Sequence, residues 1–354
     1  MAHGTAEQPE SELVAGGEKG GRAVDVLIVS LGATGGLRVA DEELLGSLRR
    51  AGATAALVRP DPPPPLRTLM LTDLRWARAA RRAAIAGLQR ASPRAVIYSS
   101  TTAALLWPRP GAIRFDAPAS GNRPGRHGLW QRPLERRRLR EAPLLLPWSD
   151  GGLREAPDVS CADRALTLPV TVESSGSQVV HDVAAVAYAA NPAKKGLDRI
   201  LEAWRRVRKP GEELVVAGAP ESELRKLGYE LPAHGVRVTP MLPYDDYRAL
   251  LRRTRVFVCA ARREDYGIAQ LEALADGCML VTTPSPGPYV ALAVARELDG
   301  RLVDEDLAVA LRTALDDPIP DYAEHALQAL APFRCAEVDR IVAEELLPRL
   351  FPRG

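Results

Sequence analysis

The chain has 354 residues, 46% of them hydrophobic, and its formal net charge is +2 at pH 7. This length and composition suit two domains with ordinary cores, and no apolar stretch is long enough to span a membrane. The polar segment 1–23 lacks the apolar core of a signal peptide, and we interpret it as a disordered leader. The four widely spaced cysteines form no metal-ligand pair, so we expect reduced thiols and a cytoplasmic protein.

The small net charge conceals a basic block at residues 66–140, where sixteen arginines stand against three acids. Such a block attracts lipid head groups, phosphates or nucleic acid. Within it, residues 66–90 predict a helix with its arginines mostly opposite an apolar face. That pattern is typical of a solvated surface helix and also of a helix lying on an anionic membrane. The basic block is therefore compatible with contact between the protein and an anionic membrane surface. Binding of nucleic acid is disfavoured, because the sequence contains no array of stacking aromatics.

The first half of the chain alternates short apolar runs, typical of buried parallel strands, with helical segments. A glycine-rich turn follows the first run, and residues 108–133 predict a long irregular loop. In chain order the predicted strands are 24–30, 54–58, 95–99 and 144–147, and the predicted helices are 39–51, 66–90 and 134–141.

The same alternation restarts after residues 166–177, which have the composition of a linker. Two successive blocks of this kind predict two Rossmann-like domains facing each other across a cleft. The predicted strands of the second block are 183–188, 214–217, 236–238, 256–260 and 279–281, and its predicted helices are 196–207, 245–253, 268–276, 304–315, 322–330 and 336–350.

The loop after the predicted strand 256–260 is unusually polar. It carries the run Arg262–Asp265 at the carboxyl end of a strand, which is where doubly wound sheets bind ligands. The following helix places Glu272 at the edge of an apolar face. A carboxylate in that position is costly unless a partner donates a hydrogen bond to it, and a ligand with hydroxyl groups is such a partner.

Two further motifs indicate a phosphate ligand and argue against a nicotinamide cofactor. Gly32–Leu37 resembles a dinucleotide fingerprint, but its third glycine is replaced by Arg38 and the next strand ends at Arg59 without an acid for a ribose. Lys194–Lys195 lies between a strand end and a helix start, where a cation and free N–H groups favour a phosphate.

The acidic run 304–306 opens a predicted helix, and we interpret it as a cap and not as a metal site.

This ordered set of motifs resembles glycosyltransferase family 4, whose members are retaining transferases of GT-B fold that use sugar nucleotides. Glu264 and Glu272, separated by seven residues, match the E-x7-E signature of that family. The segment 191–198 looks like its lysine–glycine donor site, the segment 241–258 like the region around the nucleotide base, and 34–39 like its first glycine loop. The resemblance covers nearly the whole chain past the leader, and it is weakest between residues 112 and 139.

The resemblance implies an α/β protein of GT-B fold, with two Rossmann-like doubly wound domains facing a cleft. The implied division is an acceptor-side domain at 24–167, a linker at 168–178, a nucleotide-sugar-binding domain at 179–333, and a C-terminal helix at 334–354 that crosses back to the first domain.

The resemblance also implies a role for individual residues. Glu272 would hold the ribose hydroxyls of the donor, Glu264 would contact the transferred sugar, and Lys195 would neutralise the departing diphosphate. Backbone amides at the start of the helix would add fixed positive potential. The expected donor site is completed by Lys194, Arg262, Arg263, Tyr266, Gly267, Ile268, Met241, Leu242 and Gly218, together with the glycine loop of Thr34, Gly35 and Gly36.

Two positions depart from the family pattern. An arginine that usually precedes the lysine by five or six residues is missing, because Tyr188–Ala190 stands there. Lys194 or one of Arg262–Arg263 is the candidate replacement. A first-domain histidine is also missing from its usual place, which leaves Asp116 and His127 as candidate catalytic groups on the acceptor side, or as ordinary polar loop residues.

The sequence therefore predicts a retaining, hexosyltransferase-like enzyme without metal or cofactor. It would transfer a sugar from a UDP- or GDP-sugar to a glycan, lipid or small-molecule natural product. The alternative is a GT-B protein that binds nucleotide without catalysis, and the missing arginine is the observation that favours it.

Overall fold

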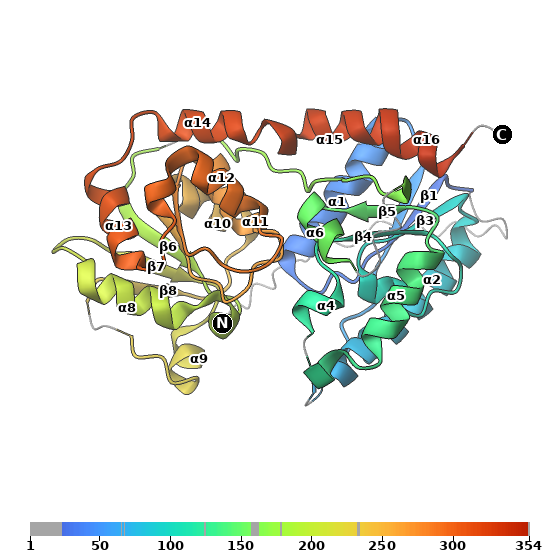
Figure 1. Cartoon of the computed structure of the whole chain (residues 1–354), viewed down its shortest axis with the longest axis horizontal. Helices are drawn as coiled ribbons and strands as arrows, with labels where there is room; N and C mark the ends of the chain where they lie inside the picture. Colours follow the sequence, from blue (N-terminus) through green and yellow to red (C-terminus); the bar gives the residue numbers. More distant parts are fainter. Residues whose placement is uncertain are drawn as a thin grey trace, which may run out of the picture.

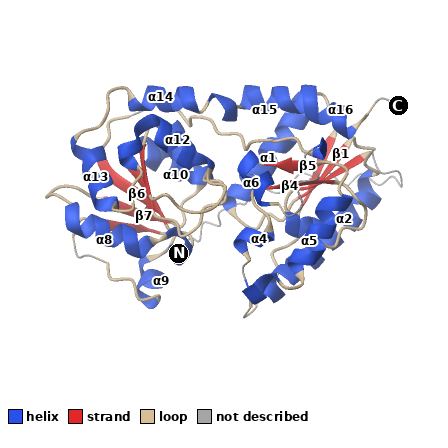
Figure 2. Ribbon diagram, viewed as in Figure 1, coloured by secondary structure: helices blue, strands red, loops and turns tan. Residues whose placement is uncertain are grey.

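In the computed structural model, described for residues 23–64, 66, 68–123, 125–156, 163–177, 179–231 and 234–352, the chain forms two α/β domains side by side. Each domain is built around a five-stranded parallel sheet, and helices cover the sheets (Figures 1 and 2). The predicted pair of Rossmann-like domains is thus confirmed. The leader predicted for residues 1–23, apart from Ala23, and the thiol of Cys161 lie outside the described residues.

The first domain has the strand order β2-β1-β3-β4-β5. Its sheet is buried on both faces, because Leu27 and Val29 pack into a cluster with α2 while Val26 and Ile28 pack into a second cluster with α1. Its elements are β1 (Val26–Val29), α1 (Gly35–Arg50), β2 (Ala55–Val58), α2 (Leu69–Ala91), β3 (Ala95–Tyr98), α3 (Thr101–Ala104), β4 (Ala112–Phe115), α4 (Ala119–Asn122), η1 (Gly125–Gly128), α5 (Gln131–Glu141), β5 (Leu145–Pro147) and α6 (Asp150–Glu155).

The expectation of an irregular loop at 108–133 is wrong, because this segment contains β4, α4 and η1. The strand was obscured by Arg114, a charged residue in the middle of a four-residue strand. The structure buries this arginine completely, with its Nη1 atom 3.4 Å from Asp41 Oδ1 and its guanidinium over the ring of Trp148. An ion pair and a cation–π contact therefore let a charge occupy a strand interior.

The second domain has the strand order β10-β9-β6-β7-β8 and contains the helices α7, α9 and α12, which the sequence did not predict. Its helix α13 begins later than predicted, and Asp306 caps it by accepting a hydrogen bond from Ala308 N at 3.0 Å. Its elements are β6 (Val183–Tyr188), α7 (Pro192–Lys195), α8 (Leu197–Val207), β7 (Leu214–Ala217), α9 (Glu221–Lys226), β8 (Val236–Thr239), α10 (Tyr244–Arg252), β9 (Thr254–Cys259), α11 (Ile268–Ala275), β10 (Met279–Thr282), α12 (Val290–Asp299), η3 (Gly300–Leu302), α13 (Leu307–Asp316) and α14 (Tyr322–Ala329).

The C-terminal helical run returns to the first domain, as predicted. After η4 (Ala331–Phe333) it comprises α15 (Cys335–Ile341), the π-helical turn η5 (Val342–Leu346) and α16 (Leu347–Leu350). In Figure 1, α14 lies along the top of the second domain, and α15 and α16 lie along the top of the first. Val338, Val342 and Leu346 are buried against Leu44 and Leu48 of α1. None of the helices in the described ranges is long and apolar enough to cross a membrane.

The domains meet through the loops at the carboxyl ends of their strands. The edge of the Trp148 ring, just after β5, contacts Tyr266 of the loop after β9, with 5.3 Å between ring centroids. Gly36, after β1, lies close enough to α11 that an added Cβ would come within 3.3 Å of Ile268 Cδ1. Both ligand-binding edges of the sheets therefore face the same interdomain space.

Candidate active site

The loop between β6 and α8 presents Lys195 to the cleft. The side chain of Asn191 caps the short helix α7 by accepting a hydrogen bond from Lys194 N at 3.1 Å. The helix ends at Gly196, whose φ is +66° and whose added Cβ would lie 2.0 Å from the carbonyl oxygen of Ala260. A residue larger than glycine cannot occupy this turn without moving the loop away from β9. The close approach of the two loops is what brings Lys195 to the residues after β9.

Lys195 forms an ion pair with Glu264 near the N-terminus of α11. The distance from Lys195 Nζ to Glu264 Oε2 is 2.6 Å, and Gln270 Nε2 donates to the same carboxylate oxygen at 3.1 Å. Burial lowers the pKa of Lys195, but the Glu264 carboxylate, with smaller contributions from Cys259 and Tyr188, raises it, and the net shift is upward. Lys195 therefore stays protonated at neutral pH, and Glu264 is fixed in orientation by two donors.

The helix α11 begins at Ile268, shortly after Glu264, and carries Glu272 about one turn further on. Its N-cap is Gly267, with φ of +97°, and no side chain caps the first turn. The free N–H groups at this end give the site fixed positive potential. The predicted loop, helix and pair of glutamates thus lie along one continuous surface of the second domain.

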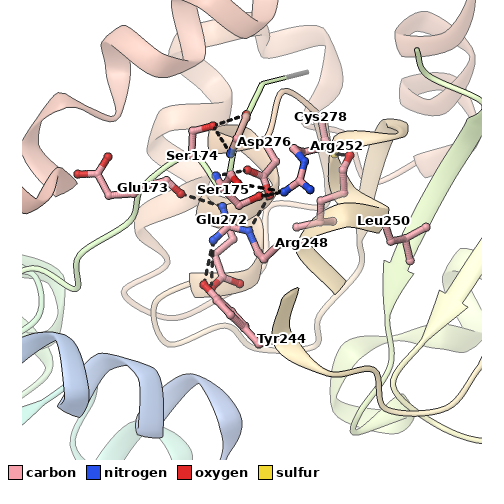
Figure 3. Close-up of polar contacts among 12 residues, drawn as sticks. Glu173, Ser174, Ser175, Tyr244, Arg248, Leu250, Arg252, Glu272, Asp276 and Cys278 are labelled. Carbon is pink, nitrogen blue, oxygen red and sulfur yellow. Dashed lines mark hydrogen bonds and ion pairs between the residues drawn. The ribbon is translucent and has the colours of Figure 1, made fainter. Parts of the chain in front are cut away.

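Glu272 lies in a hydrogen-bonded network with α10 (Figure 3). Tyr244 donates from its hydroxyl to Glu272 Oε1 at 2.8 Å, and Arg248 Nη1 donates to the same hydroxyl at 2.9 Å. Arg248 itself is held by Asp276, with 2.6 Å between Nε and Oδ2. Burial raises the pKa of Glu272, and nearby Arg248 and Tyr244 oppose that shift.

This network borders a hollow of about 210 Å³ between the domains. Glu272, Tyr244 and Arg248 line it from the second domain, while Val39 and Glu43 line it from α1. The remaining lining comes from the connecting segment, at Thr171, Val172, Glu173, Ser174 and Ser175. The carboxylate predicted to need a hydroxyl partner therefore does face a space that a ligand can enter.

The two arginines of the loop are engaged elsewhere. Arg262 Nη2 lies 2.7 Å from Asp198 Oδ2 on the protein surface. Arg263 crosses the cleft to Glu155 of α6 at 2.5 Å and also contacts Asp265 at 2.8 Å. Each candidate replacement for the missing diphosphate arginine therefore has a carboxylate partner, and so does Lys194, whose Nζ is 3.2 Å from Asp265 Oδ2.

Other predicted donor-site residues lie at the carboxyl ends of the strands. Gly218 has φ of +110° and an added Cβ would come within 2.9 Å of Ala190 N, so the chain passes close to the end of β6 there. Met241 is exposed, and Tyr188 contacts its sulfur at 3.8 Å. Leu242 is partly buried against the second-domain core.

The side chain of Tyr266 has a packing function. Its ring is buried against Trp148, and its hydroxyl accepts a hydrogen bond from Val170 N at 3.1 Å. Only the backbone around this residue, which leads into Gly267 and Ile268, is therefore placed to contact a ligand in the cleft.

The first-domain glycine loop faces the start of α11. Thr34 caps α1, with Oγ1 accepting from Leu37 N at 3.3 Å, and Gly35 and Gly36 form the first residues of the helix. A Cβ on Gly36 would press on Ile268 at 3.3 Å. This loop thus contributes a second helix N-terminus to the interdomain space.

The structure brings Asp116 to the cleft but does not join His127 to it. Asp116 directly follows β4, and its Oδ1 atom accepts a hydrogen bond from Ala117 N at 2.7 Å. Burial, together with the charge of Asp265 from the opposite domain, raises the pKa of Asp116 to about 6. His127 is exposed on η1, which packs against α2, and none of its described contacts reaches Asp116 or Lys195.

Comparison with known proteins agrees with this geometry. Residues 181–317 match the family described as Glycosyl transferases group 1. The same region of the chain contains Lys195, Glu264 and Glu272.

Similarity to solved structures extends over both domains and defines the fold as GT-B. HepE from Anabaena, solved with UDP and glucose, superposes with a TM-score of 0.66 at 12% identity, over 92% of this chain and 99% of that chain. Sucrose-phosphate synthase from Thermosynechococcus elongatus gives a TM-score of 0.65 at 14% identity, over 93% and 99% of the two chains.

One curated relative shares a shorter stretch. A GDP-mannose:cellobiosyl-diphosphopolyprenol alpha-mannosyltransferase from Xanthomonas oryzae pv. oryzae is 34% identical over 104 residues. The match covers 28% of this chain and 27% of that enzyme's length.

Sequence reasoning placed the segment 241–258 near the nucleotide base but did not connect Tyr244 and Arg248 of α10 with Glu272. Tyr244 and Arg248 are four residues apart, so one face of a helix presents both of them. The sequence shows this spacing, but it does not show that Arg248 contacts Asp276 at the C-terminal end of α11. Only the packing of α10 on α11 brings the two side chains within 2.6 Å of each other. The long-range contact carried no local signal.

Proposed function

We propose that this protein is a retaining, metal-independent glycosyltransferase of family 4 that transfers a sugar from a UDP- or GDP-sugar to an acceptor hydroxyl. The observation that carries the proposal is the ion pair of Lys195 with Glu264, 2.6 Å apart, at the open N-terminus of the helix that also bears Glu272. A cation, free N–H groups and two acceptor carboxylates in this order suit a diphosphate, a sugar and a ribose in turn.

The donor is proposed to lie along the second domain. Glu272 accepts hydrogen bonds from the ribose hydroxyls, and the hollow beside it, about 210 Å³ in volume, gives them access. Lys195 contacts the diphosphate, and Glu264 turns its free oxygen towards the hydroxyls of the transferred sugar. The base lies towards Met241 and Leu242, beyond the end of β8.

In the proposed reaction, the bond between the anomeric carbon and the diphosphate oxygen breaks, and its electron pair leaves with the diphosphate. The acceptor oxygen bonds to the anomeric carbon from the same face, and its proton passes to the carboxylate of Asp116. Lys195 and the N–H groups of α11 stabilise the negative charge that develops on the leaving group. These groups are held in place before reaction, so little reorganisation is needed.

A sugar-nucleotide screen followed by a variant tests this function. Thermal shift with UDP, GDP and their hexose conjugates identifies the donor, because a bound ligand raises the melting temperature. Slow hydrolysis of that donor by the wild type, absent in Lys195→Ala, is the expected result. Donor binding without hydrolysis or transfer in the wild type supports the non-catalytic alternative. Failure to bind any nucleotide refutes both.

We also propose that the acceptor is presented at an anionic membrane surface. Arg75 and Arg78 of α2 and Arg126 of η1 are exposed, as are the apolar side chains of Leu71 in α2 and Leu129 directly after η1. Basic and apolar groups side by side favour the head-group region of an anionic bilayer. Flotation with phosphatidylglycerol vesicles should retain the protein at low salt and release it at high salt, and equal flotation with neutral vesicles contradicts this surface.

A further inference from the structure

Arg38 lies where the glycine loop of the first domain meets the cleft. It belongs to the first turns of α1, and its guanidinium folds back over the loop, with Nη1 donating to the carbonyl oxygen of Gly32 at 3.2 Å. The same loop contacts the second domain, because a Cβ on Gly36 would press against Ile268. The guanidinium is therefore held at the edge of the loop that faces the proposed diphosphate site.

Arg38 differs from the other cations near the cleft in its pairing. Lys194, Lys195 and Arg262–Arg263 each lie within 3.2 Å of a carboxylate oxygen. Arg59, beside Arg38 in the first domain, is paired with Glu42 at 2.9 Å. Across the described ranges, Arg38 forms no ion pair, and its side chain is exposed. Its positive charge is therefore the one in this group that a ligand can take without displacing a carboxylate.

Tyr188 connects Arg38 with Lys195 electrostatically. This tyrosine ends β6, in the segment that lacks the expected arginine. Burial raises the pKa of Tyr188, and the charges of Lys195 and Arg38 both act against that shift. The two cations thus act on one phenol from opposite domains, at the position where the second domain has no cation of its own.

We propose that Arg38 binds the donor diphosphate from the first domain, opposite Lys195, and replaces the second-domain arginine that this chain lacks. This inference rests on the function proposed above and adds a residue to it. Arg38 is a catalytic residue in this scheme, because it touches the leaving group and shares its developing charge.

Because Arg38 belongs to the first domain, a diphosphate contact at this residue has a consequence that an arginine in the second domain would not have. A diphosphate held by Lys195 on one side and Arg38 on the other connects the two domains. A nucleoside has no phosphate group and therefore cannot connect Lys195 with Arg38. Nucleoside diphosphate should therefore close the cleft, whereas nucleoside should not.

Calorimetry with UDP and uridine, or with GDP and guanosine, tests the proposal in Arg38→Gln. The diphosphate is expected to bind about 10- to 100-fold more weakly than to the wild type, the range typical of a charge-assisted hydrogen bond. Nucleoside affinity should stay within about twofold. Arg38→Lys should recover part of the loss. Arg82→Gln, which removes an exposed arginine on α2, is the matched control and should bind both ligands as the wild type does.

Small-angle X-ray scattering supplies a second measurement that does not depend on affinity. At saturating diphosphate the wild type is expected to become more compact, and Arg38→Gln is not. Equal diphosphate affinity and equal compaction in Arg38→Gln overturn the role of Arg38 while leaving the proposed function intact. If the wild type binds no nucleoside diphosphate, the proposed function fails and the role of Arg38 fails with it.

Discussion

Glu272→Gln tests the ribose contact with the smallest possible change to the structure. An ionised carboxylate accepts hydrogen bonds that contribute about 1.5–3 kcal/mol each, against about 0.5–1.5 kcal/mol for a neutral acceptor. Two ribose hydroxyls bound to Glu272 therefore lose about 2–3 kcal/mol in the variant. This difference corresponds to a roughly 30- to 150-fold weaker affinity for the nucleotide.

The same substitution should leave the fold intact. The glutamine oxygen can still accept from the Tyr244 hydroxyl, which lies 2.8 Å from Glu272 Oε1. Arg248 keeps its shorter contact of 2.6 Å with Asp276, compared with 4.0 Å to Glu272. Since burial raises the pKa of Glu272, the fold disfavours its ionised form, and a neutral side chain relieves that cost. We expect a melting temperature equal to or above that of the wild type.

The assay is calorimetric titration with UDP and GDP, and Glu43→Gln is the matched control. Glu43 lines the same hollow from the first domain, so the control removes one negative charge at a similar place. Loss of charge alone should strengthen the binding of an anionic nucleotide, which is the opposite of the effect expected for Glu272→Gln. Unchanged nucleotide affinity in Glu272→Gln, with the fold preserved, would refute the ribose assignment.

Three further substitutions test separate parts of the structure. Burial raises the pKa of Asp116 to about 6, and its carboxyl group must be ionised to accept a proton. Turnover should therefore rise as pH increases through about 6. Asp116→Asn should abolish this rising limb of the pH–rate profile. Arg248→Met leaves Asp276 buried without its ion-pair partner and should lower the free energy of unfolding by about 3 kcal/mol in urea titration; a change below about 1 kcal/mol contradicts this. Gly196→Ala places a Cβ 2.0 Å from the carbonyl oxygen of Ala260, so we expect a loss of about 2–4 kcal/mol in stability and weaker nucleotide binding; wild-type behaviour in both measurements would show that the loop relaxes freely.

The fold was predictable because its strands are short apolar runs that recur with helical segments between them. β1 illustrates this, since all four of its residues are buried and contain no polar group. β4 was missed because Arg114 interrupts the apolar pattern, and the partners that make its burial tolerable are Asp41 and Trp148, far away in the sequence. Local hydrophobicity cannot report a long-range ion pair.

The candidate site was predictable where one short motif contains the residues. Glu264 and Glu272 are eight positions apart and lie on one loop and helix, so their relation is local. The partners that decide their environment are not local, because Lys195 follows β6, the neighbour of β9 in the sheet, and Tyr244 comes from α10. The expectation that Tyr266 contributes to donor binding also needed the fold, because only packing against Trp148 reveals that its ring is part of the core.

The charges of Lys195, Arg262, Arg263 and their carboxylate partners explain why a bound diphosphate needs one more cation. Lys195 is matched by Glu264, and the arginines of the loop are matched by carboxylates on both sides of the cleft. A cluster compensated in this way is well oriented but offers little net positive charge to an anion. A diphosphate, which brings about two to three negative charges, must therefore gain its attraction from groups outside the paired set. The N–H groups of α11 and the guanidinium of Arg38, which forms no ion pair within the described residues, are such groups, and they belong to opposite domains. Arg38 would therefore supply both the additional positive charge and the contact that connects the first domain to the bound diphosphate.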